Sequence, residues 1–107
     1  ALMDFDDAIR LNSKYPEAYF NRSILNLKMK QFDSAIGDLK TAIALRPNNK
    51  NYHGALAAAY AEQDDIDRFY EQLETALKKG FDVEKVPAAF ASYRQESRFK
   101  ALLAKYQ

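Results

Sequence analysis

Residues 16–49 read PEAYFNRSILNLKMKQFDSAIGDLKTAIALRPNN and contain two apolar patterns in succession. In each pattern the apolar residues recur at spacings of three and four, which is the period of one side of an α-helix. Asp33 stands near the start of the second pattern, where a carboxylate suits the unpaired N–H groups of a helix N-terminus. Pro47 ends that pattern, because a proline disfavours the helical conformation of the residue before it. The stretch therefore predicts two amphipathic helices joined by a tight turn.

The same pattern occurs more than once. Neither helix can bury its apolar side alone, so the pair is expected to fold back on itself and to need a neighbouring pair. A shift of thirty-four residues finds one without a gap, since residues 50–83 again have two helix patterns with a turn at Asp64-Asp65 between them. Residues 1–15 match only the second half of a unit. We therefore expect a chain that begins within a repeat of a longer protein.

The pattern of large and small side chains in these units resembles the tetratricopeptide repeat, a helix-turn-helix unit of thirty-four residues. The resemblance implies an all-α fold, a right-handed solenoid of antiparallel helix hairpins in a single domain, closed by a C-terminal capping helix within residues 84–107. It rests on sixteen positions, eight from each complete unit: Tyr19, Arg22, Ser23, Asn26, Ala35, Leu39, Ala42 and Pro47, then His53, Leu56, Ala57, Tyr60, Phe69, Leu73, Ala76 and Phe81.

Arg22, Asn26, Phe69 and Phe81 depart from the family pattern. Phe69 stands where the pattern has a small residue, and a phenyl ring there needs space on the facing helix. The first helix of the second unit is unusually slim and can supply that space. We predict that Phe69 fills the volume left by its small residues, which are Gly54, Ala55, Ala57, Ala58 and Ala59.

Composition and charge exclude several classes of protein. The chain has 107 residues, 48% of them hydrophobic, which is typical of one globular domain. Residues 1–77 carry nine Lys and Arg against twelve Asp and Glu, and residues 78–107 carry seven against three, so the net charges are −3 and +4. This falls short of the basic stripe that nucleic-acid binding needs, and no run approaches the roughly 20 apolar residues of a membrane helix. Nothing in the sequence indicates a cellular compartment.

No set of residues indicates catalysis, a metal site or a cofactor. His53 is the one histidine, at a packing position of the repeat, and without cysteine there is no thiolate metal site. Asp64-Asp65-Ile66-Asp67 lacks the glycine and distal glutamate of a calcium loop, so it is interpreted as a helix-start cap. The glycines are isolated, which excludes a glycine-rich phosphate loop. We expect a protein that is not an enzyme.

The resemblance implies a protein or peptide partner, held in a concave groove lined by the first helix of each unit. The groove candidates are Phe20, Asn21, Ile24, Lys28, Asn51, Ala55, Ala58 and Glu62. Two interpretations of the small residues stay open at this point. They leave room for a ligand, or they leave room only for Phe69 and the C-terminal tail.

One subfamily can be tested against the sequence. Asn21 stands where co-chaperones of this family have the asparagine of a carboxylate clamp. The clamp also needs a lysine and an arginine from the next unit, and those places hold Asn51 and Ala55. A carboxylate without cations is poorly compensated for its desolvation, so clamp function is disfavoured.

Two alternatives to peptide binding remain. The first is an architectural or self-association role, in which the apolar edge of residues 1–15 pairs two copies into a homo-oligomer. The second is that the chain is the targeting segment of a larger enzyme. The candidates for the self-association edge are Leu2, Phe5 and Ile9.

Overall fold

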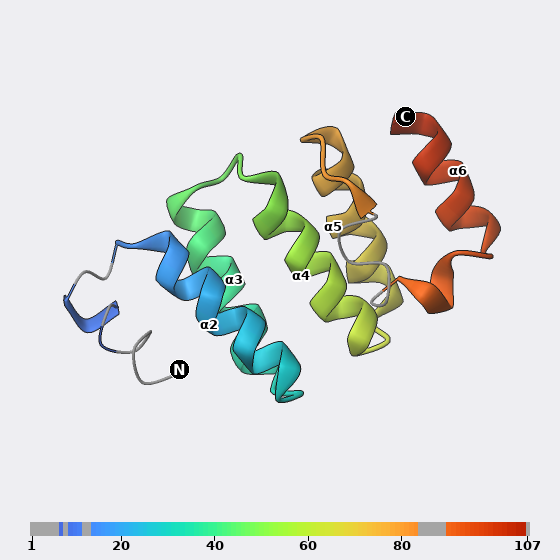
Figure 1. The fold of residues 1–107 in the computed structure, drawn as a ribbon. Coiled ribbons are helices and arrows are strands. Elements are labelled where there is room, and N and C mark those ends of the chain that lie inside the picture. The colour runs from blue at the N-terminus through green and yellow to red at the C-terminus, as the bar shows by residue number, and fades with distance from the viewer. Residues whose placement is uncertain (1–6, 8, 12–13, 84–89, 107) are drawn as a thin grey trace.

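The chain folds into a row of helical hairpins (Figure 1). The computed structural model describes residues 7, 9–11, 14–83 and 90–106. α2 and α3 form one antiparallel hairpin, α4 and α5 form the next beside it, and α6 packs at the far end against α5. These described residues contain no β-strand, and the prediction of an all-α array of hairpins with a C-terminal capping helix is confirmed. The helices are α2 (Pro16–Lys28), α3 (Phe32–Leu45), α4 (Lys50–Glu62), α5 (Ile66–Lys78), the 3-10 turn η2 (Ala91–Tyr93) and α6 (Ser97–Tyr106).

Two predicted segments, residues 1–15 and 84–107, lie partly outside the described residues. Residues 7 and 9–11 are helical, as expected for the second helix of a truncated unit. Leu2 and Phe5, two of the self-association candidates, fall outside the description. Within the described ranges, no helix is both long enough and apolar enough to cross a lipid bilayer.

Each hairpin turns through one residue in the left-handed conformation. After α2, Lys30 has a φ of 60°, and the N–H groups of Lys30 and Gln31 donate to the carbonyls of Leu27 (3.0 Å) and Asn26 (2.8 Å). This pair of hydrogen bonds is the Schellman motif, which usually ends with a glycine. Asp64, thirty-four residues later, has a φ of 58° in the equivalent turn. The repeat of the sequence is thus also a repeat of backbone conformation.

Replacing Lys30 by glycine is expected to raise the free energy of unfolding by about 1 kcal/mol, because a left-handed residue with a Cβ is strained. Urea denaturation of the Lys30→Gly variant and the wild type measures the difference. Gly80→Ala is the opposite control, since Gly80 has a φ of 93° and an alanine there is expected to lower stability. A loss of stability in Lys30→Gly contradicts the prediction.

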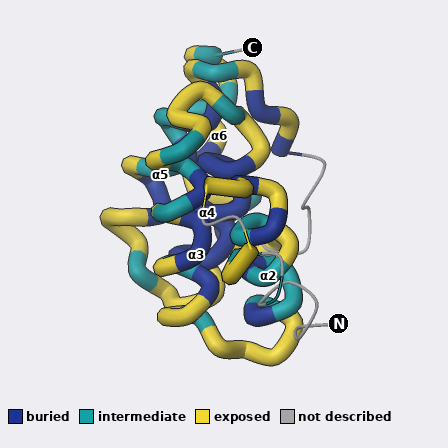
Figure 2. The backbone as a smooth tube through the Cα atoms, turned by 90° about the vertical axis from the view of Figure 1, so that its left-hand side faces the viewer, coloured by how far each residue is buried: buried dark blue, intermediate teal, exposed yellow. Residues whose placement is uncertain are grey.

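The core lies in the second hairpin and the residues after it. In α4 every residue from 52 to 61 is buried, so this helix is covered on all sides (Figure 2). Phe69 on α5 is fully buried, with ring centroids 4.3 Å from Tyr93, 5.6 Å from Phe90 and 6.4 Å from Phe99. Aromatic side chains from the residues that follow α5 therefore surround Phe69.

The space over Gly54 is filled by Phe81 and not by Phe69. A Cβ placed on Gly54 lies far inside van der Waals distance of three ring atoms of Phe81. The prediction that Phe69 fills this volume is wrong at Gly54, because Phe81 directly follows the end of α5 and its ring returns to α4. Phe81, a departure from the family pattern, thus complements the missing side chain of Gly54. In the preceding unit Phe20 stands at the place of Gly54, and Pro47 stands at the place of Phe81. The large aromatic side chain is therefore on the helix in that unit, and after the helix pair in the second unit.

Candidate functional site

The accessibility of α2 and α4 differs at equivalent positions. Five positions on α2 each have an equivalent on α4, thirty-four residues later in the sequence. On α2 all five are exposed or half-buried, whereas on α4 the first four are buried and only the last is exposed. These positions are therefore accessible on α2 and mostly buried on α4. The pairs are Phe20 and Gly54, Asn21 and Ala55, Ile24 and Ala58, Leu27 and Ala61, and Lys28 and Glu62.

The chain's own C-terminal residues belong to the cluster that closes the α4 surface. The exposed fractions of Ala55 and Ala58 are 7% and 5%. Both residues belong to one apolar cluster with Phe81, Val83 and Phe90. The small side chains of α4 thus pack within the chain's own core, and in this structure Ala55 and Ala58 are not accessible to a partner.

The other groove candidates are accessible. Asn21, Lys28, Asn51 and Glu62 are exposed. Phe20 and Ile24 are half-buried, and the Phe20 ring lies 4.9 Å from that of Tyr52. Of the self-association candidates, Ile9 is half-buried.

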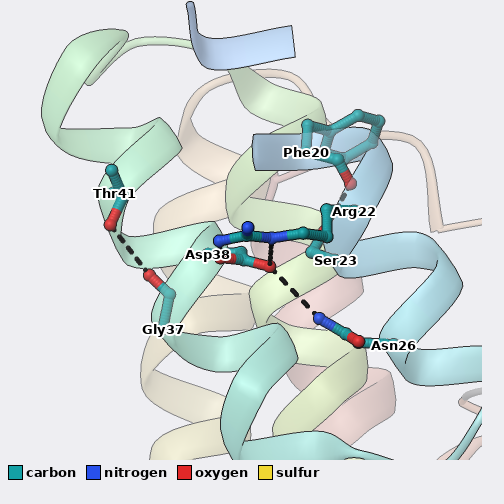
Figure 3. A network of polar contacts seen from close by, with 7 residues as sticks. All are labelled: Phe20, Arg22, Ser23, Asn26, Gly37, Asp38 and Thr41. Atoms are coloured by element: carbon teal, nitrogen blue, oxygen red, sulfur yellow. Dashed lines mark hydrogen bonds and ion pairs between the residues drawn. The ribbon is translucent and has the colours of Figure 1, made fainter. Parts of the chain in front are cut away.

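A polar network fixes α2 against α3 (Figure 3). Asp38 on α3 accepts two hydrogen bonds from the Arg22 guanidinium, at 2.9 and 2.6 Å, and a third from the Asn26 amide at 3.2 Å. Asn26 and Asp38 are buried, so each polar atom needs such a partner. Arg22 and Asn26 are two of the departures from the family pattern. The role of Arg22 and Asn26 was not predicted from sequence, although two polar residues at packing positions indicate a buried partner.

A second set of polar contacts ties α6 to α5. The Tyr70 hydroxyl donates to Glu96 at 2.7 Å, and the Arg98 guanidinium lies 4.1 Å from the centroid of the Tyr70 ring. Burial raises the pKa of Tyr70, and the hydrogen bond to Glu96 raises it further. On the next turn of α5, Glu74 accepts from Tyr106 at 2.9 Å and from Lys105 at 3.2 Å. These contacts hold the capping helix in place.

Stability is expected to fall in acid partly through Glu74. Its hydrogen bonds to Tyr106 and then Lys105 lower its pKa in the folded chain. Its contribution is therefore present above the carboxyl pKa of the unfolded chain, about 4.3, and is lost as the pH falls through the lower folded value. Urea midpoints should show Glu74→Gln less stable than wild type at neutral pH, with the difference closing below about pH 4. A difference that is independent of pH contradicts this.

Residues of types that carry chemistry in enzymes have structural roles here. His53 is buried, and its Nε2 lies 2.7 Å from the Pro47 carbonyl oxygen, while none of the described residues offers a hydrogen-bond partner to its Nδ1. Asp65 caps α5, accepting from the backbone N–H of Arg68 at 3.4 Å and from its guanidinium at 2.8 Å. These hydrogen bonds, chiefly that from the guanidinium, lower the pKa of Asp65. The described part of the chain contains no group of three side chains placed to hold a metal ion.

Comparison with known proteins agrees with this architecture. The family model described as "Tetratricopeptide repeat" matches residues 26–92. Serine/threonine-protein phosphatase 5 of Rattus norvegicus is 35% identical over 51 residues, which are 48% of this chain and 10% of the phosphatase. Bacteriophage adsorption protein A of Escherichia coli K12 is 33% identical over 78 residues, which are 73% of this chain and 8% of that protein. The chain thus spans about a tenth or less of the length of these relatives. With the family model covering more than half of its residues, the chain belongs to the tetratricopeptide repeat family.

Proposed function

We propose that this chain is a non-catalytic interaction module that binds a peptide or protein segment on the concave surface over α2. Tetratricopeptide repeats are in general protein-interaction modules, and the chain belongs to that family. One observation carries the choice of surface: equivalent positions are accessible on α2 and buried on α4. A partner that approaches the concave side therefore meets side chains of α2 and the two ends of α4.

The accessible side chains suit an extended segment. The Asn21 amide can donate and accept at once, which matches the backbone of a peptide in extended conformation. Phe20 and Ile24 supply apolar contact area beside it, and both are half-buried and so already ordered. Lys28 and Glu62 place opposite charges at the far ends of the two helices. Recognition here depends on shape, one amide and a few charges.

A carboxylate clamp stays disfavoured. The two places that need cations hold Asn51 and Ala55, and Ala55 is also buried. The proposed partner is therefore not recognised by a terminal carboxylate on α4.

A second candidate function is targeting within a larger protein. The phosphatase that resembles this chain is ten times as long as the matched part, and the described residues contain no group of three side chains placed to hold a metal ion. On this proposal the module brings an enzyme to its partner and takes no part in the reaction. Attachment by self-association is a different alternative, through Ile9 and the apolar residues near it.

The test is a pull-down with the wild type and the Asn21→Arg variant, after light scattering has established the oligomeric state of both. Asn21→Arg adds a charged block to an exposed position on α2 without entering the core. Ser34→Arg is the matched control, because Ser34 is exposed on α3. We expect a discrete partner to be retained by the wild type and by Ser34→Arg, and to be lost by Asn21→Arg. If the same proteins bind all three, or none binds, the surface over α2 is not the site, and a dimer in solution supports self-association.

A further inference from the structure

Four cations gather at one edge of the molecule, away from the concave surface. They are Arg46, Lys50, Lys78 and Lys79, and we call them the basic edge. Arg46 follows the end of α3, Lys50 begins α4, and the two lysines stand at the end of α5. These helix ends lie together at the top of the view in Figure 1.

Contacts between the two hairpins bring these cations together. The Lys79 ammonium donates to the Asn48 side-chain oxygen at 2.9 Å, which joins the end of α5 to the turn before α4. The Lys50 side chain passes Gly80, with its Cδ 3.9 Å from the position of a Cβ on that glycine. The basic edge is thus one surface built from parts of both hairpins.

The four cations have no ion-pair partners in the described part of the chain, whereas the acidic residues Asp38, Asp65 and Glu74 are each paired elsewhere. Cations at the ends of α3 and α5 are favoured there by the helix dipole. Lys50 is different, because the first turn of a helix disfavours a cation. Helix stability therefore does not account for Lys50.

The turn between α3 and α4 adds hydrogen-bond donors to this charge. A shallow depression is lined by residues 45–49, with Arg46 on its rim. The Asn49 side-chain oxygen accepts from the backbone N–H groups of Asn51 and Tyr52, so its amide N–H groups remain as donors toward a ligand. A surface with cations and amide donors matches carboxylates.

We infer that the basic edge binds an acidic segment of a partner protein, rich in Asp or Glu. Charge complementarity carries this choice, because the basic edge combines four cations with a depression lined by Arg46, Asn48 and Asn49. A nucleic acid or an anionic membrane fits less well, since the whole chain has a net charge of only +1. Glu17 also faces this region, because it and Arg46 both act on the Tyr52 hydroxyl. The inference concerns a different surface from the one over α2 and does not depend on it.

The test is a titration of the full chain with a fluorescent glutamate-rich peptide at low and at physiological salt. We expect saturable binding that weakens with salt, and an affinity about fivefold lower in the double variant Lys50→Gln/Lys79→Gln. The matched control is Lys40→Gln/Lys100→Gln, which removes two exposed lysines, on α3 and α6, outside the basic edge and is expected to bind like the wild type. Circular dichroism of each variant checks that it is folded.

Three results overturn the inference. The first is the absence of binding to wild type at low salt. The second is an equal loss of affinity in both double variants, which indicates a response to net charge alone. The third is tighter binding of duplex DNA, or of vesicles containing phosphatidylserine, than of the peptide. The pull-down with Asn21→Arg is read separately, so failure at one surface leaves the other proposal standing.

Discussion

Gly54→Leu is expected to lower the free energy of unfolding by about 2 to 3 kcal/mol, since a leucine must either displace the Phe81 ring or force α4 away from it. The Phe81 ring rests directly on the Gly54 backbone, and both residues are buried. Displacement loses the burial of an aromatic side chain, and retention overpacks the site. Urea denaturation followed by circular dichroism measures the loss.

Two controls make this result specific to the Gly54 and Phe81 pair. Gly37 on α3 has no atom within 4 Å of an added Cβ, so Gly37→Leu is expected to raise stability by about 0.5 to 1 kcal/mol through helix propensity. In a Phe81→Ala background, Gly54→Leu is expected to cost much less than in wild type, because the space over the glycine is then empty. An equal cost in both backgrounds contradicts the proposed contact.

The second large effect is expected from Asp38→Ala, at about 3 kcal/mol. The substitution leaves the Asn26 amide buried without its Asp38 acceptor and removes the two hydrogen bonds that the Arg22 guanidinium donates to Asp38. The Arg22 side chain is 25% exposed and can still reach water, which keeps the cost at the lower end for a broken buried pair. Lys40→Ala is the control, because Lys40 is exposed on the same helix and should change stability by less than about 0.5 kcal/mol.

The stability lost in Asp38→Ala should be recovered when Arg22 and Asn26 are replaced together with Asp38. The second hairpin has Leu56, Tyr60 and Gln72 at the positions of Arg22, Asn26 and Asp38. A triple variant with these residues in the first hairpin should unfold within about 1 kcal/mol of wild type, since apolar packing can replace a buried ion pair. If Asp38→Ala costs no more than Lys40→Ala, the network does not stabilise the hairpin.

The helices were predictable from sequence for a local reason. The apolar period, Pro47 and the glycine after α5 act within a few residues, and the thirty-four-residue shift relates the two hairpins without a gap. The capping helix was expected within residues 84–107, and α6 spans Ser97–Tyr106. The polar departures Arg22 and Asn26 were visible as exceptions, but their partner Asp38 was not, because pairing depends on how two helices are rotated against each other.

The sequence alone determined the all-α repeat fold, the positions of the helices, the absence of cysteine chemistry and the set of residues from which an interaction surface could be drawn. The tertiary structure decided which of those residues are accessible. Asn21 and Ala55 are equivalent in sequence, yet one is exposed and the other buried beside residues that follow α5. Helix formation depends on neighbours along the chain, whereas burial depends on which distant side chains arrive at a surface. For α4 those side chains, Phe81 and Phe90 among them, come from a segment that does not repeat the pattern of the hairpins.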